Sequence, residues 1–130
     1  MTRKISHEDN IVKKYYEWFF YQYENSGVAI CHHSPNENIA VGKEYKLRAI
    51  RYNQKLRAMG TKKGFCDMII LCKDKYLLLE FKYGKNKLSD SQKDFMASLE
   101  KIGCNEKYIV YSYEEAKKHT INFIKKVYGN

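Results

Sequence analysis

Apolar residues recur along this 130-residue chain at two different spacings. Spacings of three and four residues, typical of amphipathic helices, cover residues 7–26, 44–59, 90–102 and 113–127. Short apolar runs typical of strands cover residues 28–33, 67–72, 76–82 and 107–112. The pattern predicts one α/β domain over residues 1–130, with the element order α-β-α-β-β-α-β-α and a central sheet covered by helices.

Side-chain caps mark the start of three predicted helices. Serine stands three residues before an acidic or amide residue in the pairs Ser6–Asp9, Ser89–Gln92 and Ser112–Glu115. Each pair has the spacing of a capping box, in which the two side chains satisfy backbone amides at the helix start. Glycine residues then follow the first three helices, at positions 27, 60 and 103.

The strand predicted at residues 76–82 ends in charged residues although it is otherwise apolar. Because side chains alternate faces, Glu80 and Lys82 share a face with Leu78. A strand that is apolar on both faces must be covered on both, so Glu80 needs a compensating partner. If the preceding hairpin turns near residues 73–75, Asp67 lies opposite either Glu80 or Lys82.

This placement predicts a metal site at one end of the sheet. Two adjacent carboxylates repel each other unless a cation lies between them, and oxygen ligands select Mg²⁺ or Mn²⁺. Lys82 could then position water or stabilise negative charge, which is the arrangement needed for phosphodiester hydrolysis. The alternative is a strand-end salt bridge with no catalytic role. Glu-x-Lys also begins at Glu44 and Glu115, on predicted helix surfaces, so the tripeptide alone is weak evidence for a site.

The charge balance predicts an anionic partner. Lysine and arginine number 24 against 15 acidic residues, a formal net charge of +9, which favours nucleic acid over a merely basic surface. Much of the excess lies on the predicted helix 44–59, around an apolar stripe, and just after it. The candidate DNA-binding residues there are Lys46, Arg48, Arg51, Lys55, Lys62 and Lys63.

Two protein classes are disfavoured by the sequence. No apolar run is long enough to cross a bilayer, and the first ten residues do not have the pattern of a secretory signal, so we expect a cytoplasmic protein. The four cysteines show no Cys-x-x-Cys spacing. We therefore expect reduced thiols rather than a zinc site or two disulfides.

The stretch around Glu80 resembles a known nuclease family. Residues 60–103 read GTKKGFCDMIILCKDKYLLLEFKYGKNKLSDSQKDFMASLEKIG. They are similar to the virus-type replication-repair nuclease (VRR-NUC) domain of the PD-(D/E)xK superfamily, in which a Gly-x-Pro-Asp motif, an apolar hairpin ending Glu-x-Lys, and Leu-Ser-x-x-Gln follow in order. Cys66 stands where the family has proline, and it removes no carboxylate. A weaker similarity extends to HHSPNEN at residues 32–38.

The resemblance implies a restriction-endonuclease-like core with a mixed four-stranded sheet, and it implies roles for particular residues. Asp67, Glu80 and the backbone carbonyl of Phe81 would bind Mg²⁺, with Mn²⁺ as a substitute. Lys82 would be the catalytic lysine, and Gln92 a further catalytic residue. Two residues keep alternative explanations: Gln92 as a helix cap, and Glu8, an outer metal ligand in the family, as a first-turn acidic residue favoured by the helix dipole.

The resemblance also implies a substrate and an assembly. We expect an intracellular homodimer, of bacterial or phage origin, that cuts branched DNA such as Holliday junctions. His33 would contact DNA, although a strand-end histidine facing solvent is an ordinary feature, and Glu37 would lie near the site. The alternatives are an inactive DNA-binding module on the same fold and a nuclease that acts on linear or single-stranded DNA.

Overall fold

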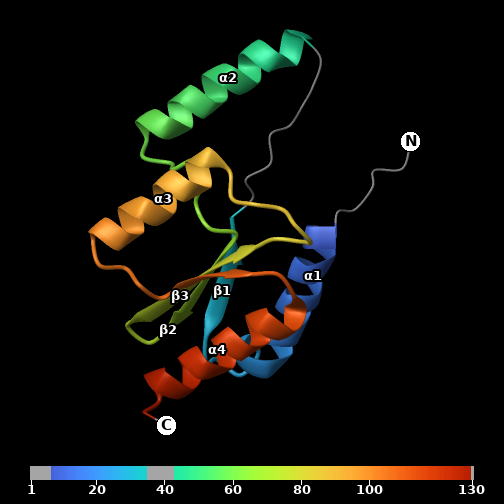
Figure 1. Cartoon of the computed structure of the whole chain (residues 1–130), viewed down its shortest axis with the longest axis vertical. Coiled ribbons are helices and arrows are strands. Elements are labelled where there is room, and N and C mark those ends of the chain that lie inside the picture. Colours follow the sequence, from blue (N-terminus) through green and yellow to red (C-terminus); the bar gives the residue numbers. More distant parts are fainter. Residues whose placement is uncertain (1–6, 35–42, 130) are drawn as a thin grey trace.

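The structure, a computed structural model, describes residues 7–34 and 43–129. Its elements follow the predicted order (Figure 1). The helices are α1 (His7–Phe19), α2 (Lys43–Ala58), α3 (Asp90–Lys101) and α4 (Tyr113–Val127), and a π-helical segment η1 (Phe20–Glu24) continues α1. The strands are β1 (Ile30–His33), β2 (Met68–Cys72), β3 (Lys75–Phe81) and β4 (Lys107–Val110). The predicted α/β fold is therefore confirmed.

The four strands form one mixed sheet in the order β1-β2-β3-β4. β2 pairs antiparallel with both β1 and β3, whereas β3 and β4 run parallel. The β2–β3 register pairs Met68 with Leu79 and Cys72 with Lys75, so Lys73 and Asp74 form the turn. Continued by one residue, this register sets Asp67 opposite Glu80, which selects one of the two pairings that the sequence allowed.

The sheet is covered on both faces, as the apolar β3 strand requires. Leu77, Leu79 and Phe81 belong to a core that includes residues of α1 and α4, among them Tyr15 and Phe123. The other face carries a smaller core of Cys66, Leu78 and Leu99, the last from α3. Glu80 and Lys82 continue the Leu78 face, so the charged end of β3 lies on the side of the sheet that α3 covers.

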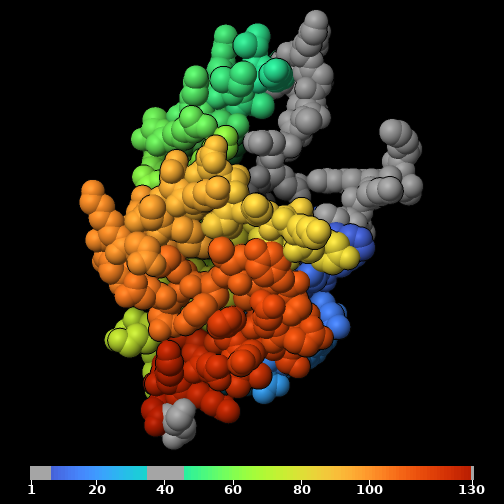
Figure 2. All heavy atoms as spheres, viewed as in Figure 1, coloured from blue at the N-terminus to red at the C-terminus, as the bar shows by residue number. Residues whose placement is uncertain are grey.

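Helix α2 lies at one end of the molecule, beyond α3 (Figures 1 and 2). Its predicted apolar stripe is only partly covered. Ala49 and Leu56 are half-buried, whereas Tyr52 and Met59 remain 60% and 72% exposed. The stripe residues that the structure describes therefore join neither core of the sheet, and α2 lies beside the sheet and its covering helices rather than forming one of these layers.

The predicted caps and thiols agree with the structure where it describes them. Ser89 and Gln92 form the complete capping box of α3, and the Ser112 side chain accepts a hydrogen bond from the amide of Glu115. Ser6 lies outside the described residues. The four cysteines are free. Within residues 7–34 and 43–129, none of the helices has the length and apolar content to cross a membrane.

Candidate active site

The Asp67 and Glu80 carboxylates are held by two hydrogen bonds that cross the open end of the β2–β3 hairpin. The Asp67 amide donates to Glu80 Oε2 at 3.2 Å. The amide of Phe81 donates in turn to Asp67 Oδ2 at 2.8 Å. Each carboxylate thus accepts a bond from the backbone of the opposing strand, which fixes the two side chains next to each other.

Burial makes ionisation of both carboxyl groups unfavourable. Glu80 is only 1% exposed and Asp67 is half-buried. Loss of hydration, followed by the charge of Asp67, raises the pKa of Glu80 to about 8. Loss of hydration also raises the pKa of Asp67, against the opposing effect of its bond from Phe81. The pair therefore retains a proton near neutral pH unless another positive charge replaces it.

Two basic side chains, Lys82 and His33, lie close to the pair. The charge of Lys82 lowers the pKa of both carboxyl groups, and His33 acts in the same direction on Asp67. Lys82 follows the last residue of β3, where its amide donates to Val110 O at 2.9 Å. His33 ends β1, beside Met68, and is exposed. Both residues that were predicted from sequence therefore lie next to Asp67.

Gln92 makes the helix-cap contact that the sequence predicted and also contacts Glu80, while its catalytic role stays a prediction. Its Oε1 accepts from the Ser89 amide at 2.8 Å, as a helix cap. Its Nε2 donates to Glu80 Oε1 at 2.7 Å. The capping box of α3 therefore holds an amide group against the buried carboxylate, and the helix start and the carboxylate pair form one hydrogen-bonded unit.

Gly64 brings the segment before Asp67 against the start of α3. Its φ is +85°, and a Cβ at this position would lie 2.3 Å from the carbonyl oxygen of Ser91. Glycine is the residue that fits both this backbone conformation and this close approach. The same loop carries Lys62 and Lys63, and Lys63 directly precedes the residue that makes this contact.

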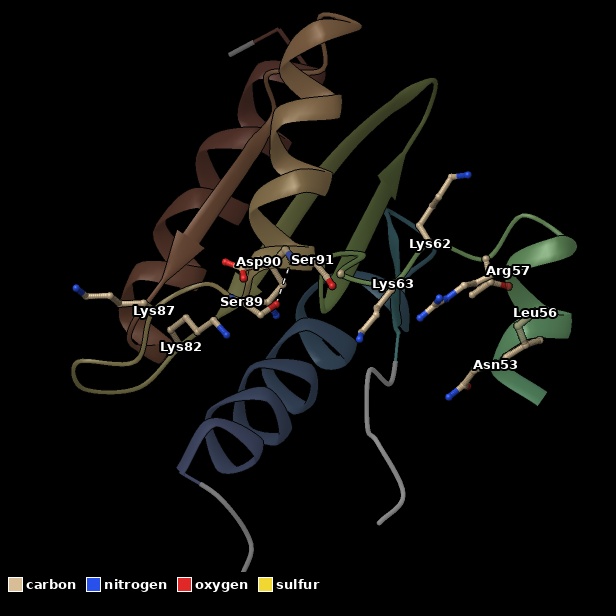
Figure 3. Close-up of a pocket in the computed structure, with 13 residues that line it drawn as sticks. Asn53, Leu56, Arg57, Lys62, Lys63, Lys82, Lys87, Ser89, Asp90 and Ser91 are labelled. Atoms are coloured by element: carbon tan, nitrogen blue, oxygen red, sulfur yellow. Dashed lines mark hydrogen bonds between the residues drawn. The ribbon is translucent and has the colours of Figure 1, made fainter. Parts of the chain in front are cut away.

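A cavity of about 670 Å³ opens between α2, the loop 61–64 and the start of α3. Figure 3 shows the side chains around it. The lining includes five cationic residues and one acidic residue: Arg57, Lys62, Lys63, Lys82, Lys87 and Asp90. We call this cavity the basic groove. Gln92 also lines it, so the groove leads to the Asp67–Glu80 pair.

Sequence reasoning missed Arg57 and Lys87 as residues of the groove. Arg57 is one of several basic residues on its helix, and Lys87 lies in the loop that follows β3. Neither position has a motif of its own. Only the position of α2 relative to α3 shows that Arg57 lies across a cavity from Lys82.

Other predicted residues lie outside the basic groove. Lys46, Arg48, Arg51 and Lys55 are exposed on α2 and do not line it. Glu8, in the first turn of α1, accepts a hydrogen bond from Asn86 Nδ2 at 2.9 Å. The roles of these five residues stay predictions. Glu37 lies outside the described residues.

The donor set near Glu80 fits a hard divalent cation. Two desolvated carboxylates with a net tendency to retain a proton offer the oxygen ligands that Mg²⁺ and Mn²⁺ prefer, and Phe81 O follows in the same strand. The set has only these two carboxylates. Within the part of the chain that the structure describes, no group of three His, Cys, Asp or Glu residues is placed to hold a metal. Such an ion would keep coordination positions for water or phosphate.

No family model matches this sequence, and no curated protein matches it.

Proposed function

We propose that this protein is a Mg²⁺-dependent endonuclease that hydrolyses phosphodiester bonds in DNA. One observation carries the proposal: the desolvated Asp67–Glu80 pair adjoins a groove lined by five cationic side chains. A carboxylate pair of this kind favours a divalent cation, and a basic groove favours a polyanion. The two features together favour phosphate chemistry over a simple salt bridge.

The residues take roles that their contacts support. Asp67 and Glu80 would hold the ion, with Phe81 O as a further ligand, and the bound ion would activate water and neutralise charge on the phosphate. Lys82 faces the groove from the end of β3 and would stabilise negative charge near the carboxylates. Gln92 would hold Glu80 in place through its 2.7 Å bond.

The resemblance to virus-type replication-repair nucleases adds the finer parts of the proposal. It favours branched DNA, such as Holliday junctions, as the substrate and a homodimer as the active form. It also favours a role in DNA repair or recombination within the cell. Light scattering after gel filtration tests the assembly, and a mass of one chain in the active fraction would contradict the homodimer.

A second candidate is an inactive DNA-binding module on the same fold. The observation that favours it is the enclosure of Glu80, which is 1% exposed and already accepts bonds from Asp67 N and Gln92 Nε2. In that case the cluster would stabilise the domain, and the basic groove would bind DNA without cutting it. A nuclease acting on linear or single-stranded DNA is the third candidate, which only a substrate comparison separates from the first.

Cleavage assays distinguish these candidates. The purified protein is incubated with fixed four-way junctions, matched linear duplexes and single strands, with Mg²⁺, Mn²⁺ or a chelator. We expect metal-dependent cutting, fastest on the junctions. Glu80→Gln and Lys82→Met should each lower the rate by about 100-fold or more. Lys101→Gln, which changes an exposed residue at the far end of α3, should not.

Each outcome selects one candidate. If no DNA is cut with either metal while DNA is still bound, the inactive module is correct. If linear or single-stranded DNA is cut as fast as the junctions, the branched-DNA preference is wrong. Cutting that persists in Glu80→Gln at the wild-type rate would show that the reaction takes place elsewhere or comes from a contaminant.

A further inference from the structure

The basic groove has unbalanced positive charge. Among the described residues, no ion pair joins Arg57, Lys62, Lys63, Lys82 or Lys87 to a carboxylate, and the ion pairs of this part of the chain involve other residues. Asp90 is the one acidic residue in the part of the lining that the structure describes. So many cationic side chains around one cavity produce a local positive potential, which attracts an anionic partner.

The side chains converge from different elements of the fold. In Figure 3, Arg57 on α2 and Lys63 on the 61–64 loop extend into the space beside the start of α3. Lys82 points toward the same space from the end of β3, whereas Lys62 and Lys87 point outward. Arg57 and Lys63 therefore lie at the outer part of the groove, and Lys82 and the carboxylate pair lie at its inner part.

The lining also indicates which part of a nucleic acid is bound. Among the described residues that line the groove, none is aromatic and Leu56 is the one large apolar residue. Bases in single-strand sites usually stack on aromatic side chains, and protein interfaces are usually anchored by buried aromatic residues. A groove with cations and no such anchor is suited to the sugar-phosphate backbone.

Helix α2 presents different basic residues on its two sides. Arg48 and Arg57 are nine residues apart, which is about two and a half helical turns, so they project in opposite directions. Lys55 is rotated from Arg57 by about 200°. Of the basic residues of α2 whose side chains the structure describes, at positions 46–58, only Arg57 lines the groove.

We propose that Arg57 and Lys63 bind one backbone phosphate of the nucleic acid, adjacent to the phosphate at the carboxylate pair. The contact is independent of base sequence and aligns the strand along the groove toward Lys82. This inference rests on the proposed function for the identity of the anion, but not on whether the bond is cut. Arg57 is thus a positioning residue that the charge pattern of α2 alone did not single out.

Equilibrium binding of a short DNA duplex, measured by fluorescence anisotropy in a chelator over a range of salt concentrations, tests the inference. Each phosphate neutralised contributes about 0.9 to the slope of log K against log salt. We expect the slope to fall by about that amount in Arg57→Gln and in Lys63→Gln, and to be restored in Arg57→Lys. The control Lys101→Gln should keep the wild-type slope.

The double variant locates the two cations at one phosphate. Because Arg57 and Lys63 share the contact, the double variant Arg57→Gln/Lys63→Gln should lose less affinity than the sum of the two single losses. Additive losses would show that the two residues contact separate phosphates, which overturns the shared site. Wild-type slopes in both single variants would remove the groove from the interface.

A competitor tests the class of partner. Polyglutamate at equal charge concentration should displace the duplex far less well than an unlabelled duplex does. Equal displacement would indicate an acidic protein partner and overturn the proposal.

The binding measurements contain no metal, so they test the groove contact separately from cleavage. A protein that binds DNA through the groove but cuts nothing would disprove the nuclease alone. A nuclease with an unchanged Arg57→Gln slope would disprove the groove contact alone.

Discussion

Glu80 occupies a position where an ionised carboxylate is unfavourable without compensation. Its oxygens accept hydrogen bonds from Asp67 N and Gln92 Nε2, which favour the charged form. Burial and the neighbouring Asp67 carboxylate outweigh them and raise its pKa to about 8. The structure thus holds an acidic group that is protonated at neutral pH in the absence of metal.

This pKa predicts that the metal-free protein loses stability as the pH rises. The folded state binds a proton that the unfolded state has released, so the free energy of unfolding is highest below the ordinary glutamate pKa. It should fall from about pH 5 to about pH 8, by up to about 1.4 kcal/mol per pH unit. Glu80→Gln, which resembles the protonated side chain, should flatten this slope.

Urea unfolding in a chelator at several pH values measures the effect. Asp94→Asn provides the control, since Asp94 is exposed on α3. A wild-type stability that rises over the same pH range would show that Glu80 is ionised in the folded protein and that its burial is better compensated than its contacts indicate.

Gln92 allows its two contacts to be separated by a single substitution. Gln92→Glu keeps an oxygen that can accept from the Ser89 amide, so the capping box survives. The substitution replaces the Nε2 donor to Glu80 by an oxygen of a third carboxylate. We expect the pKa of Glu80 to rise further and the loss of stability to extend to higher pH.

Glu115→Gln is the matched control for this prediction. Glu115 stands at the corresponding position of α4, where its amide donates to Ser112 Oγ and its carboxylate accepts from Tyr111 N. The control also exchanges an amide and a carboxylate group, but at a position on α4 that does not contact the carboxylate pair. An identical pH profile in Gln92→Glu and Glu115→Gln would mean that Gln92 acts on the helix alone.

At the level of elements, the site depends on the close contact between the 61–64 loop and α3. Gly64→Ala would place a Cβ 2.3 Å from Ser91 O, in a backbone conformation that side chains other than glycine rarely adopt. We expect the free energy of unfolding to fall by about 3 kcal/mol or more. Urea denaturation followed by circular dichroism measures the loss.

Gly60→Ala separates steric overlap from backbone strain. Gly60 also has a positive φ, of +100°, but a Cβ there would meet nothing within 4 Å. We expect it to lower stability by about 1 kcal/mol, from the backbone alone. If both variants were destabilised equally, the approach of Gly64 to Ser91 would have no energetic importance.

The elements themselves were largely predictable from the sequence, because their signals are local. Helical spacing located the helices, and the Ser89–Gln92 spacing marked the start of α3. Alternation in β3 placed Glu80 with Leu78 and away from Leu79, which the two cores confirm. The π-helical turn at Phe20–Glu24 was missed, since it interrupts an otherwise continuous helical pattern.

At the level of the whole molecule, the candidate site was predictable only where the hairpin determines it. The pairing of Asp67 with Glu80 follows from a two-residue turn, so sequence alone narrowed it to two registers. The basic groove depends instead on where α2 lies beside α3, and no residue pattern encodes that placement. For this reason the sequence predicted that α2 has a basic surface for an anionic partner, but it did not distinguish Arg57 from the other basic residues.

The carboxylate pair exists only in the folded chain, because Asp67 and Glu80 come from the two sides of a hairpin. An ion bound by both must therefore stabilise the whole domain. At a Mg²⁺ concentration 100 times its dissociation constant, the free energy of unfolding should rise by about 2.7 kcal/mol, which would raise the midpoint of thermal unfolding by about 10 °C.

Thermal unfolding at pH 8 with increasing Mg²⁺ measures this stabilisation. The double variant Asp67→Asn/Glu80→Gln should show no Mg²⁺-dependent shift. Asp94→Asn/Glu114→Gln removes the same charge from two exposed positions on α3 and α4 and should keep the wild-type shift. A shift that survives in the first double variant would place the ion elsewhere. Absence of any shift in the wild-type protein would mean that the pair is stabilised by its proton and by Lys82 rather than by a metal.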